Sequence, residues 1–243
     1  MLLAIDVGNT RIKVAVFEKD ILIWQDAFDK EDAVDRFSII LIKYTDIKNA
    51  VLSRVGFLDE SVLKWLERQV NLHVITADSP MPFQNGYETP KTLGIDRMVL
   101  ASGAVFQFPK QNRLVIDSGT CITYDFIDAD DNYLGGAISP GFRLRYEALH
   151  NYTAKLPLLT LESPSGVIGN STKQAIHSGV VNGILYEVEG FIERYREQYQ
   201  VLTVILTGGD TDFLAKRVKN TIFANPNFLL ESLNHLYQYT INK

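Results

Sequence analysis

The sequence predicts an α/β protein built from two related halves, and three observations lead to this prediction. Short apolar runs of strand length alternate with longer segments whose apolar residues recur at helical spacing. An Asp-x-Gly turn between two strand-like runs occurs near the N-terminus and again nearly half the chain later. The composition of the 243 residues, with 46% hydrophobic and 22% charged, is typical of a globular chain of one or two domains.

The first half begins with a pattern typical of a β-hairpin. An apolar run over Leu2–Ile5 and an alternating run over Ile12–Val16 flank a turn that contains glycine. Residues 78–93 hold three prolines and an Asn-Gly pair, which indicates a loop. The remaining expected strands are Ile21–Phe28, Ala50–Ser53 and Leu72–Thr76, and the expected helices are Glu31–Tyr44, Glu60–Val70 and Ile95–Gln107.

The second half repeats the opening pattern. The run Leu114–Ile116 leads into Asp117, and a second run, Ile122–Ile127, follows the glycine turn. The further expected elements are a long helix over Ser171–Tyr199, a strand over Val201–Leu206, and helices over Thr211–Val218 and Leu229–Tyr239. We therefore expect two domains, residues 1–110 and 111–243, with the active site in the cleft between them.

Charge and cysteine content exclude several classes of protein. The net charge is −5 and no run of Lys and Arg stands out, which argues against a nucleic acid or an acidic membrane as partner. The single cysteine, Cys121, cannot form an internal disulfide, so a reducing, cytoplasmic location is expected. Asp6 interrupts the N-terminal apolar stretch too early for a signal peptide, and no apolar run approaches the ~20 residues of a membrane span.

The two Asp-x-Gly turns predict a phosphate site. Ile5-Asp6-Val7-Gly8-Asn9-Thr10 is matched by Ile116-Asp117-Ser118-Gly119-Thr120-Cys121. Backbone N–H groups in a tight glycine turn form an anion-binding concavity, and an aspartate at the strand end can hold a cation. A single copy is more readily interpreted as a plain hairpin turn, but two copies favour a clamp on a polyphosphate and its counter-ion. Neither a P-loop nor a Rossmann fingerprint is present, so the nucleotide prediction depends on these turns.

Two further motifs have both a functional and a structural interpretation. In Gly94-Ile95-Asp96-Arg97, the carboxylate could take the proton of an attacking hydroxyl, or it could simply favour a helix N-terminus. The glycine pair in Thr207-Gly208-Gly209-Asp210 could admit adenine and ribose, or could simply join a strand to a helix. The residues alone leave these alternatives open.

Together these motifs resemble one known family. The two Asp-x-Gly turns, Gly94–Arg97, Thr207–Asp210 and Gly135-Gly136-Ala137-Ile138-Ser139-Pro140-Gly141 are similar to those of type III pantothenate kinases. That family belongs to the superfamily of acetate and sugar kinases, chaperone ATPases and actin. The resemblance implies two ribonuclease-H-like domains with mixed sheets flanked by helices.

The resemblance also implies an activity and a set of site residues. The activity is ATP-dependent phosphorylation of the primary hydroxyl of pantothenate, the first step of coenzyme A synthesis. Asp96 would be the general base, and Thr172 would reach the substrate from the neighbouring subunit of a homodimer, although a threonine there is equally suited to the start of a helix. The residues implied in pantothenate binding are Tyr87, Gly94, Ile95, Asp96, Arg97 and Thr172.

The same resemblance places the nucleotide and cations. ATP with Mg²⁺ would bind at Asp6, Val7, Gly8, Asn9, Thr10, Arg11, Ile12, Lys13 and Thr120. A monovalent cation, K⁺ or NH₄⁺, would bind near Asp117. A kinase of the same superfamily acting on a sugar or another small hydroxyl substrate is the alternative enzyme, and a regulatory relative without activity is the alternative outside catalysis. The presence of Asp96 and Arg97 argues against the second alternative.

Overall fold

The computed structural model describes residues 1–199 and 201–242, which form two compact units. The first unit comprises Met1–Lys110, Asp130–Leu134 and Asn227–Lys243, and the second comprises Gln111–Ala129 and Gly135–Pro226. The C-terminal segment was expected in the second half, but by its contacts it belongs to the first unit. Within the described ranges, no helix is both long and apolar enough to cross a bilayer.

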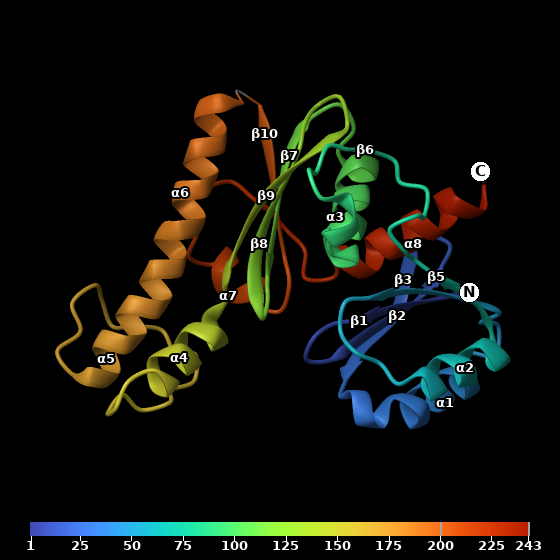
Figure 1. Ribbon diagram of the computed structural model, residues 1–243, viewed down its shortest axis with the longest axis horizontal. Helices are drawn as coiled ribbons and strands as arrows, with labels where there is room; N and C mark the ends of the chain where they lie inside the picture. The colour runs from blue at the N-terminus through green and yellow to red at the C-terminus, as the bar shows by residue number, and fades with distance from the viewer. Residues whose placement is uncertain (200, 243) are drawn as a thin grey trace. The chain divides into compact units, whose positions relative to one another are not determined.

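The first unit contains a five-stranded mixed sheet of order β3-β2-β1-β4-β5 (Figure 1). β1 pairs antiparallel with β2 and parallel with β4, so the expected N-terminal hairpin is present and is extended by parallel neighbours. Its strands are β1 (Leu2–Val7), β2 (Ile12–Glu18), β3 (Ile21–Phe28), β4 (Asn49–Arg54) and β5 (Asn71–Val74). All six residues of β1 are buried, which is typical of a central strand covered on both faces.

Helices cover both faces of this sheet (Figure 1). α1 (Ala33–Lys43) and α2 (Glu60–Gln69) pack their apolar faces on alternate residues of β1, including Leu3 and Ile5. α8 (Phe228–Ile241) packs against β1, β4 and α3 (Ile95–Gln107). A Cβ at Gly103 of α3 would lie 1.8 Å from Oγ of Ser232 of α8, so the glycine permits the close helix crossing. This contact explains why the C-terminal helix joins the first unit.

The second unit contains the mixed sheet β11-β10-β7-β8-β9. β7 pairs antiparallel with β8 and parallel with β10, which repeats the arrangement of β1 with β2 and β4. One face buries a core of residues from the helices α4 to α7, such as Ile184 and Leu214, against Leu114 and Ile116 of β7. The strands are β7 (Asn112–Ser118), β8 (Cys121–Ile127), β9 (Asn132–Pro140), β10 (Leu202–Thr207) and β11 (Phe223–Ala224); the helices are α4 (Phe142–Asn151), α5 (Thr172–His177), α6 (Gly183–Gln198) and α7 (Thr211–Ala215).

Three features differ from the sequence-based expectation. The expected helix over Ser171–Tyr199 is α5 and α6 joined by a π-helical turn over Ser178–Asn182. β9 runs through Gly135 and Gly136, where no strand was expected. The residues at the start of β9 also pair with a two-residue strand, β6 (Gln84–Asn85), inside the first unit.

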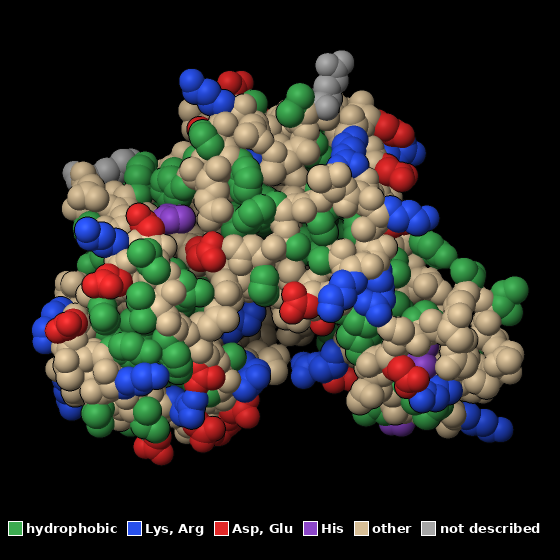
Figure 2. All heavy atoms as spheres, turned by 180° about the vertical axis from the view of Figure 1, so that it is seen from behind, with side chains coloured by type: hydrophobic (Ala, Val, Ile, Leu, Met, Phe, Trp, Pro, Cys, Tyr) green, Lys and Arg blue, Asp and Glu red, His purple; other side chains and the backbone are tan. Residues whose placement is uncertain are grey.

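The surface carries mixed charge. On the face drawn in Figure 2, Lys and Arg side chains lie interspersed with Asp and Glu. This pattern agrees with the small negative net charge of −5 and forms no broad basic field on that face.

Candidate active site

The first Asp-x-Gly turn joins β1 to β2. Its register places Asp6 opposite Lys13 and Val7 opposite Ile12, and the N–H of Gly8 donates to the carbonyl oxygen of Arg11 over 3.1 Å. The chain after β4 closes on this turn, because the N–H groups of Val55 and Gly56 both donate to the carbonyl oxygen of Val7. A Cβ at Gly56 would lie 2.1 Å from the carbonyl oxygen of Gly8, so only glycine fits there.

Asp6 at the end of β1 has an unusual acidity. Its side chain is buried, and Oγ of Ser53 donates to Oδ1 of Asp6 over 2.9 Å. Burial raises the pKa of Asp6 from 3.8 to about 6, while Ser53 and the charge of Lys13 act in the opposite direction. The charge of Asp96 also raises this pKa, so the first turn and the Gly94–Arg97 motif interact electrostatically within one unit.

The basic residues around the first turn have separate roles. Arg11 Nη2 donates to the carbonyl oxygen of Ala27 over 2.7 Å, and Nε lies 3.3 Å from Oδ1 of Asp29, so this side chain secures the chain after β3. Lys30, which the sequence did not single out, donates from Nζ to the carbonyl oxygen of Asn9 over 3.0 Å. Lys13, by contrast, lies opposite Asp6 and acts on its charge.

The Gly94–Arg97 motif forms the N-terminus of α3, as expected. Gly94 is the N-cap, and Oδ1 of Asp96 accepts a hydrogen bond from the N–H of Arg97 over 2.8 Å. A Cβ at Gly94 would lie 2.5 Å from that oxygen, so the glycine leaves room for the carboxylate in this position. The motif therefore orients an acidic side chain at a helix N-terminus, whose dipole favours the ionised form.

Tyr87 and Arg97 also come together. The guanidinium carbon of Arg97 lies 5.7 Å from the ring centroid of Tyr87, a cation–π distance, and the Arg97 side chain is buried. Tyr133, at the start of β9, packs its ring 6.0 Å from that of Tyr87. Short pairing of β6 with β9 holds the loop in place, because the N–H of Gly86 donates to the carbonyl oxygen of Tyr133. The sequence did not indicate Tyr133, since nothing in its neighbourhood marks a strand pairing with residues 84–85.

The second Asp-x-Gly turn joins β7 to β8 and is held by two other segments. The N–H of Gly141 donates to the carbonyl oxygen of Thr120 over 3.1 Å, and Gly119 closes the turn onto Cys121. On the other side, Oγ of Ser118 donates to Oδ2 of Asp210 over 3.2 Å. The predicted motif Thr207–Asp210 thus lies directly against the turn.

The approach of β10 to Asp117 is close. Gly208 has a φ of +98°, and a Cβ there would lie 2.3 Å from Oδ1 of Asp117. Thr207 lies beside Asp117 in the parallel register of β10 and β7. Its Oγ1 is buried and has no hydrogen-bond partner among the residues that the structure describes. A carboxylate and an unpaired hydroxyl oxygen side by side are suitable ligands for a cation that prefers oxygen.

Thr172 is the first residue of α5 in the second unit, and it is exposed. The preceding Ser171 is the N-cap, whose Oγ accepts the N–H of Gln174 over 3.2 Å. The capping role that the sequence left open for this region is therefore performed by Ser171.

Comparison with known proteins identifies the family to which the chain belongs. The profile of the family described as type III pantothenate kinase matches residues 2–194. The chain belongs to that family. A type III pantothenate kinase from Flavobacterium johnsoniae is 60% identical, with 100% of this chain and 99% of the relative covered.

Solved structures show the same fold outside the close family. A candidate Baf family transcriptional activator from Campylobacter jejuni superposes with a TM-score of 0.64 at 21% identity, covering 99% of this chain and 100% of that one. A ROK family glucokinase from Streptomyces griseus, in complex with glucose and AMPPNP, gives 0.52 at 12% identity, covering 100% and 99%. These superpositions confirm the α/β fold with two mixed sheets that the sequence predicted. At identities this low they say nothing about the substrate of this chain.

Proposed function

We propose that this chain transfers the γ-phosphoryl group of ATP to the primary hydroxyl of pantothenate, with Asp96 as the general base. The activity follows from membership of the type III pantothenate kinase family, which phosphorylates pantothenate in coenzyme A biosynthesis. The observation that supports the residue assignment is the charge interaction of Asp96 with Asp6, next to the Arg97–Tyr87 pair. A phosphoryl donor site and an acceptor site must adjoin in a kinase.

At the acceptor end, Asp96 takes the proton of the attacking hydroxyl. The hydrogen bond from the N–H of Arg97 fixes the carboxylate, and Gly94 and Ile95 provide the backbone around it. The buried guanidinium of Arg97 pairs with the substrate carboxylate, and Tyr87 holds the guanidinium in place from its ring face. None of the contacts described for Gly94–Arg97 and Tyr87 favours a sugar as the acceptor.

At the donor end, the backbone of residues 7–12 and Thr120 bind the phosphates, and Lys13 adds a positive charge. When bound, ATP supplies the phosphoryl group, and Mg²⁺ and a monovalent cation neutralise phosphate charge. Asp6 would orient Mg²⁺, which suits a carboxylate whose pKa of about 6 leaves it mainly ionised at neutral pH. Asp117 and Thr207 would bind the monovalent cation, K⁺ or NH₄⁺, through their oxygens.

Three further assignments complete the proposal. The enzyme acts as a homodimer, and Thr172 contacts pantothenate from the partner subunit; its exposure at the start of α5 leaves it accessible for this. The location is cytoplasmic, in agreement with a single free cysteine, Cys121. The partner is a small molecule, with neither nucleic acid nor membrane involved.

A coupled ADP-release assay tests the proposal. We expect turnover with pantothenate, dependence on K⁺ or NH₄⁺, and no turnover with a panel of sugars. Turnover with a sugar but not with pantothenate would overturn the assignment of pantothenate as the acceptor. Equal rates in Na⁺ and K⁺ would overturn the proposed requirement for K⁺ or NH₄⁺. Light scattering of the purified chain should give the mass of a dimer, and Thr172→Ala should raise the KM for pantothenate while leaving the KM for ATP unchanged.

A further inference from the structure

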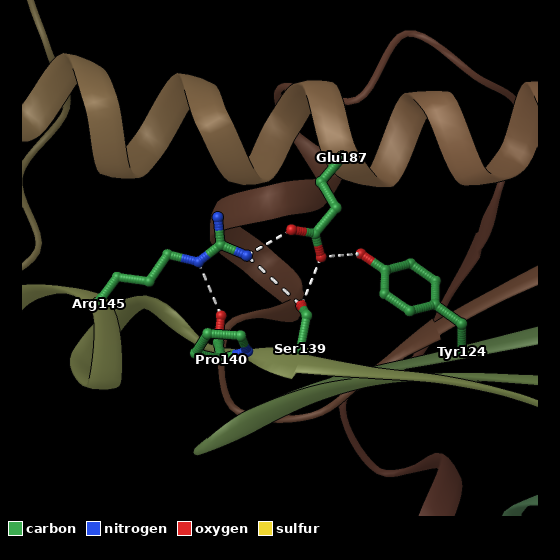
Figure 3. Close-up of polar contacts among 5 residues, drawn as sticks. All are labelled: Tyr124, Ser139, Pro140, Arg145 and Glu187. Carbon is green, nitrogen blue, oxygen red and sulfur yellow. Dashed lines mark hydrogen bonds and ion pairs between the residues drawn. The ribbon is translucent and has the colours of Figure 1, made fainter. Parts of the chain in front are cut away.

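Three side chains from three elements of the second unit converge on the carboxylate of Glu187 (Figure 3). Oε1 of Glu187 on α6 accepts a hydrogen bond from the hydroxyl of Tyr124 on β8, over 2.9 Å, and another from Oγ of Ser139 on β9. Oε2 of Glu187 forms an ion pair with Nη2 of Arg145 on α4. The same guanidinium donates from Nε to the carbonyl oxygen of Pro140 over 2.8 Å.

Glu187 is ionised in this network. Its side chain is only 22% exposed and that of Arg145 only 21%. Burial acts to raise the pKa of Glu187, but the hydrogen bonds from Ser139, Arg145 and Tyr124 together hold it below its ordinary value. A half-buried ion pair is a weak source of stability, because desolvation offsets the attraction between the charges. The directed hydrogen bonds of Glu187, in contrast, fix the positions of Tyr124, Ser139 and Arg145.

The groups that Glu187 fixes lead to the second Asp-x-Gly turn. Ser139 and Pro140 end β9, and Gly141 follows them directly. The N–H of Gly141 donates to the carbonyl oxygen of Thr120, and a Cβ at Gly141 would lie 2.2 Å from the carbonyl oxygen of Gly119. The end of β9 therefore forms a rigid support behind the turn.

We propose that Glu187 is a positioning residue for the second turn. It acts through Ser139 and Arg145 on the end of β9, and thereby sets the backbone position of Gly119 and Thr120. Glu187 itself touches no substrate. The inference rests on the proposed assignment of Thr120 to the phosphates of ATP, and it extends that assignment to a network that the sequence motifs did not include.

Steady-state kinetics with a separate stability measurement test this role. Glu187→Ala removes every contact of the Glu187 carboxylate, whereas Glu187→Gln keeps an oxygen for Tyr124 and Ser139 but loses the charge and the oxygen that accepts from Arg145. We expect the KM for ATP to rise about tenfold in the first variant and about threefold in the second, with the KM for pantothenate within twofold of wild type, since a single lost hydrogen bond corresponds to roughly 1 kcal/mol or a factor of 5. Binding of AMPPNP by calorimetry should weaken in the same order.

Matched variants separate positioning from plain stability. Glu193→Gln changes an exposed carboxylate of the same helix and should leave both KM values and the melting temperature unchanged. Ser139→Ala removes one link on β9 without leaving a buried charge unpaired, so it keeps the test open if a Glu187 variant fails to fold. A lower melting temperature with an unaltered KM for ATP in Glu187→Gln and Ser139→Ala would overturn the proposal, as would equal increases in both KM values. Absence of pantothenate turnover in the wild-type chain, measured in the same assay, would instead overturn the proposed function.

Discussion

The two Asp-x-Gly turns share a sequence pattern and a strand topology, yet their surroundings differ. In the first, the aspartate is buried, accepts from Ser53 and experiences the charge of Asp96. In the second, the turn is enclosed by backbone: Gly141 from the end of β9 and Gly208 from the end of β10. The difference shows that one motif can have two kinds of surroundings, a buried acidic centre that interacts with the Gly94–Arg97 motif and a turn enclosed by backbone.

Three glycines outside the two Asp-x-Gly turns show the same division. Gly56 and Gly208 each allow another segment to lie against its turn, because a Cβ at either would meet an atom of that turn at 2.1 Å or 2.3 Å. Gly94 instead leaves room for a flexible carboxylate. Variants at these positions and at the aspartates should therefore affect stability in some places and catalysis in others.

The largest expected effect is that of Asp96→Asn. Removing a general base typically lowers kcat by about 10²–10⁴-fold, and we expect a loss in that range. Neither the melting temperature nor the affinity for AMPPNP should change much, because an amide oxygen can also accept the hydrogen bond that Oδ1 of Asp96 accepts from the N–H of Arg97. Asp78→Asn, at an exposed site of the same unit, is the control. A turnover number equal to that of wild type would remove Asp96 from the mechanism.

Next in size is the effect of pH on Asp6. Folding raises the pKa of Asp6 from 3.8 to about 6, because burial favours the neutral carboxyl group. The neutral group therefore stabilises the folded state fully below pH 3.8, and this stabilisation is lost as the pH rises through 6. Asp6→Asn stays neutral and should keep that stability, which corresponds to at most about 3 kcal/mol above pH 6.

Melting temperatures from pH 4 to pH 8 check this prediction. The variant and the wild type should agree near pH 4 and diverge up to about pH 6, with the variant the more stable. Its activity should fall, since the proposed ligand for Mg²⁺ is lost. A wild type that is the more stable at pH 8 would contradict the assigned direction.

A smaller effect is expected from Gly208→Ala in the second turn. The positive φ and the contact with Oδ1 of Asp117 should destabilise the fold by about 1–3 kcal/mol. Gly209→Ala is a close control, because a Cβ there meets nothing within 4 Å. Denaturant unfolding of the two variants measures the difference in stability. Equal unfolding midpoints would show that a methyl group at position 208 is accommodated beside Asp117 without strain.

The smallest effect on stability is expected from Gly94→Ala. The new methyl group displaces Oδ1 of Asp96, and a carboxylate can move at little cost in stability. Misplacement by about 1 Å can lower a rate by up to roughly a hundredfold, and we expect a tenfold or larger fall in kcat with a near-normal melting temperature. An unaltered kcat would mean that the position of Asp96 in this structure is not the one used in catalysis.

Local patterns in the sequence were sufficient for much of the fold. The N-terminal hairpin, the strand that ends at Asp117 and the start of α3 at Ile95 were all expected, because alternation, helical spacing and glycine turns are properties of short segments. β9 was missed for the opposite reason. Gly136 allows β9 to pass close to β8, because a Cβ there would lie 1.5 Å from the carbonyl oxygen of Tyr124. This neighbour belongs to another strand, so the local sequence did not indicate why glycine occurs here.

The site divides in the same way. Asp6, Asp96 and Asp117 stand out in the sequence because each belongs to a short motif with its own glycine, and type III pantothenate kinase family membership supports the activity. Ser53, Tyr133 and Glu187 carry no local signal, since each acts on a partner dozens of residues away.

The sequence by itself determined the alternation of strands and helices, the paired turns and the family. Only the tertiary structure decided that Asp6 is buried with a raised pKa, that α8 joins the first unit, and that a carboxylate on α6 binds Ser139 and Arg145. The physical reason is that desolvation, helix packing and buried ion pairs depend on which distant segments meet, whereas turns and periodicity depend on neighbours along the chain.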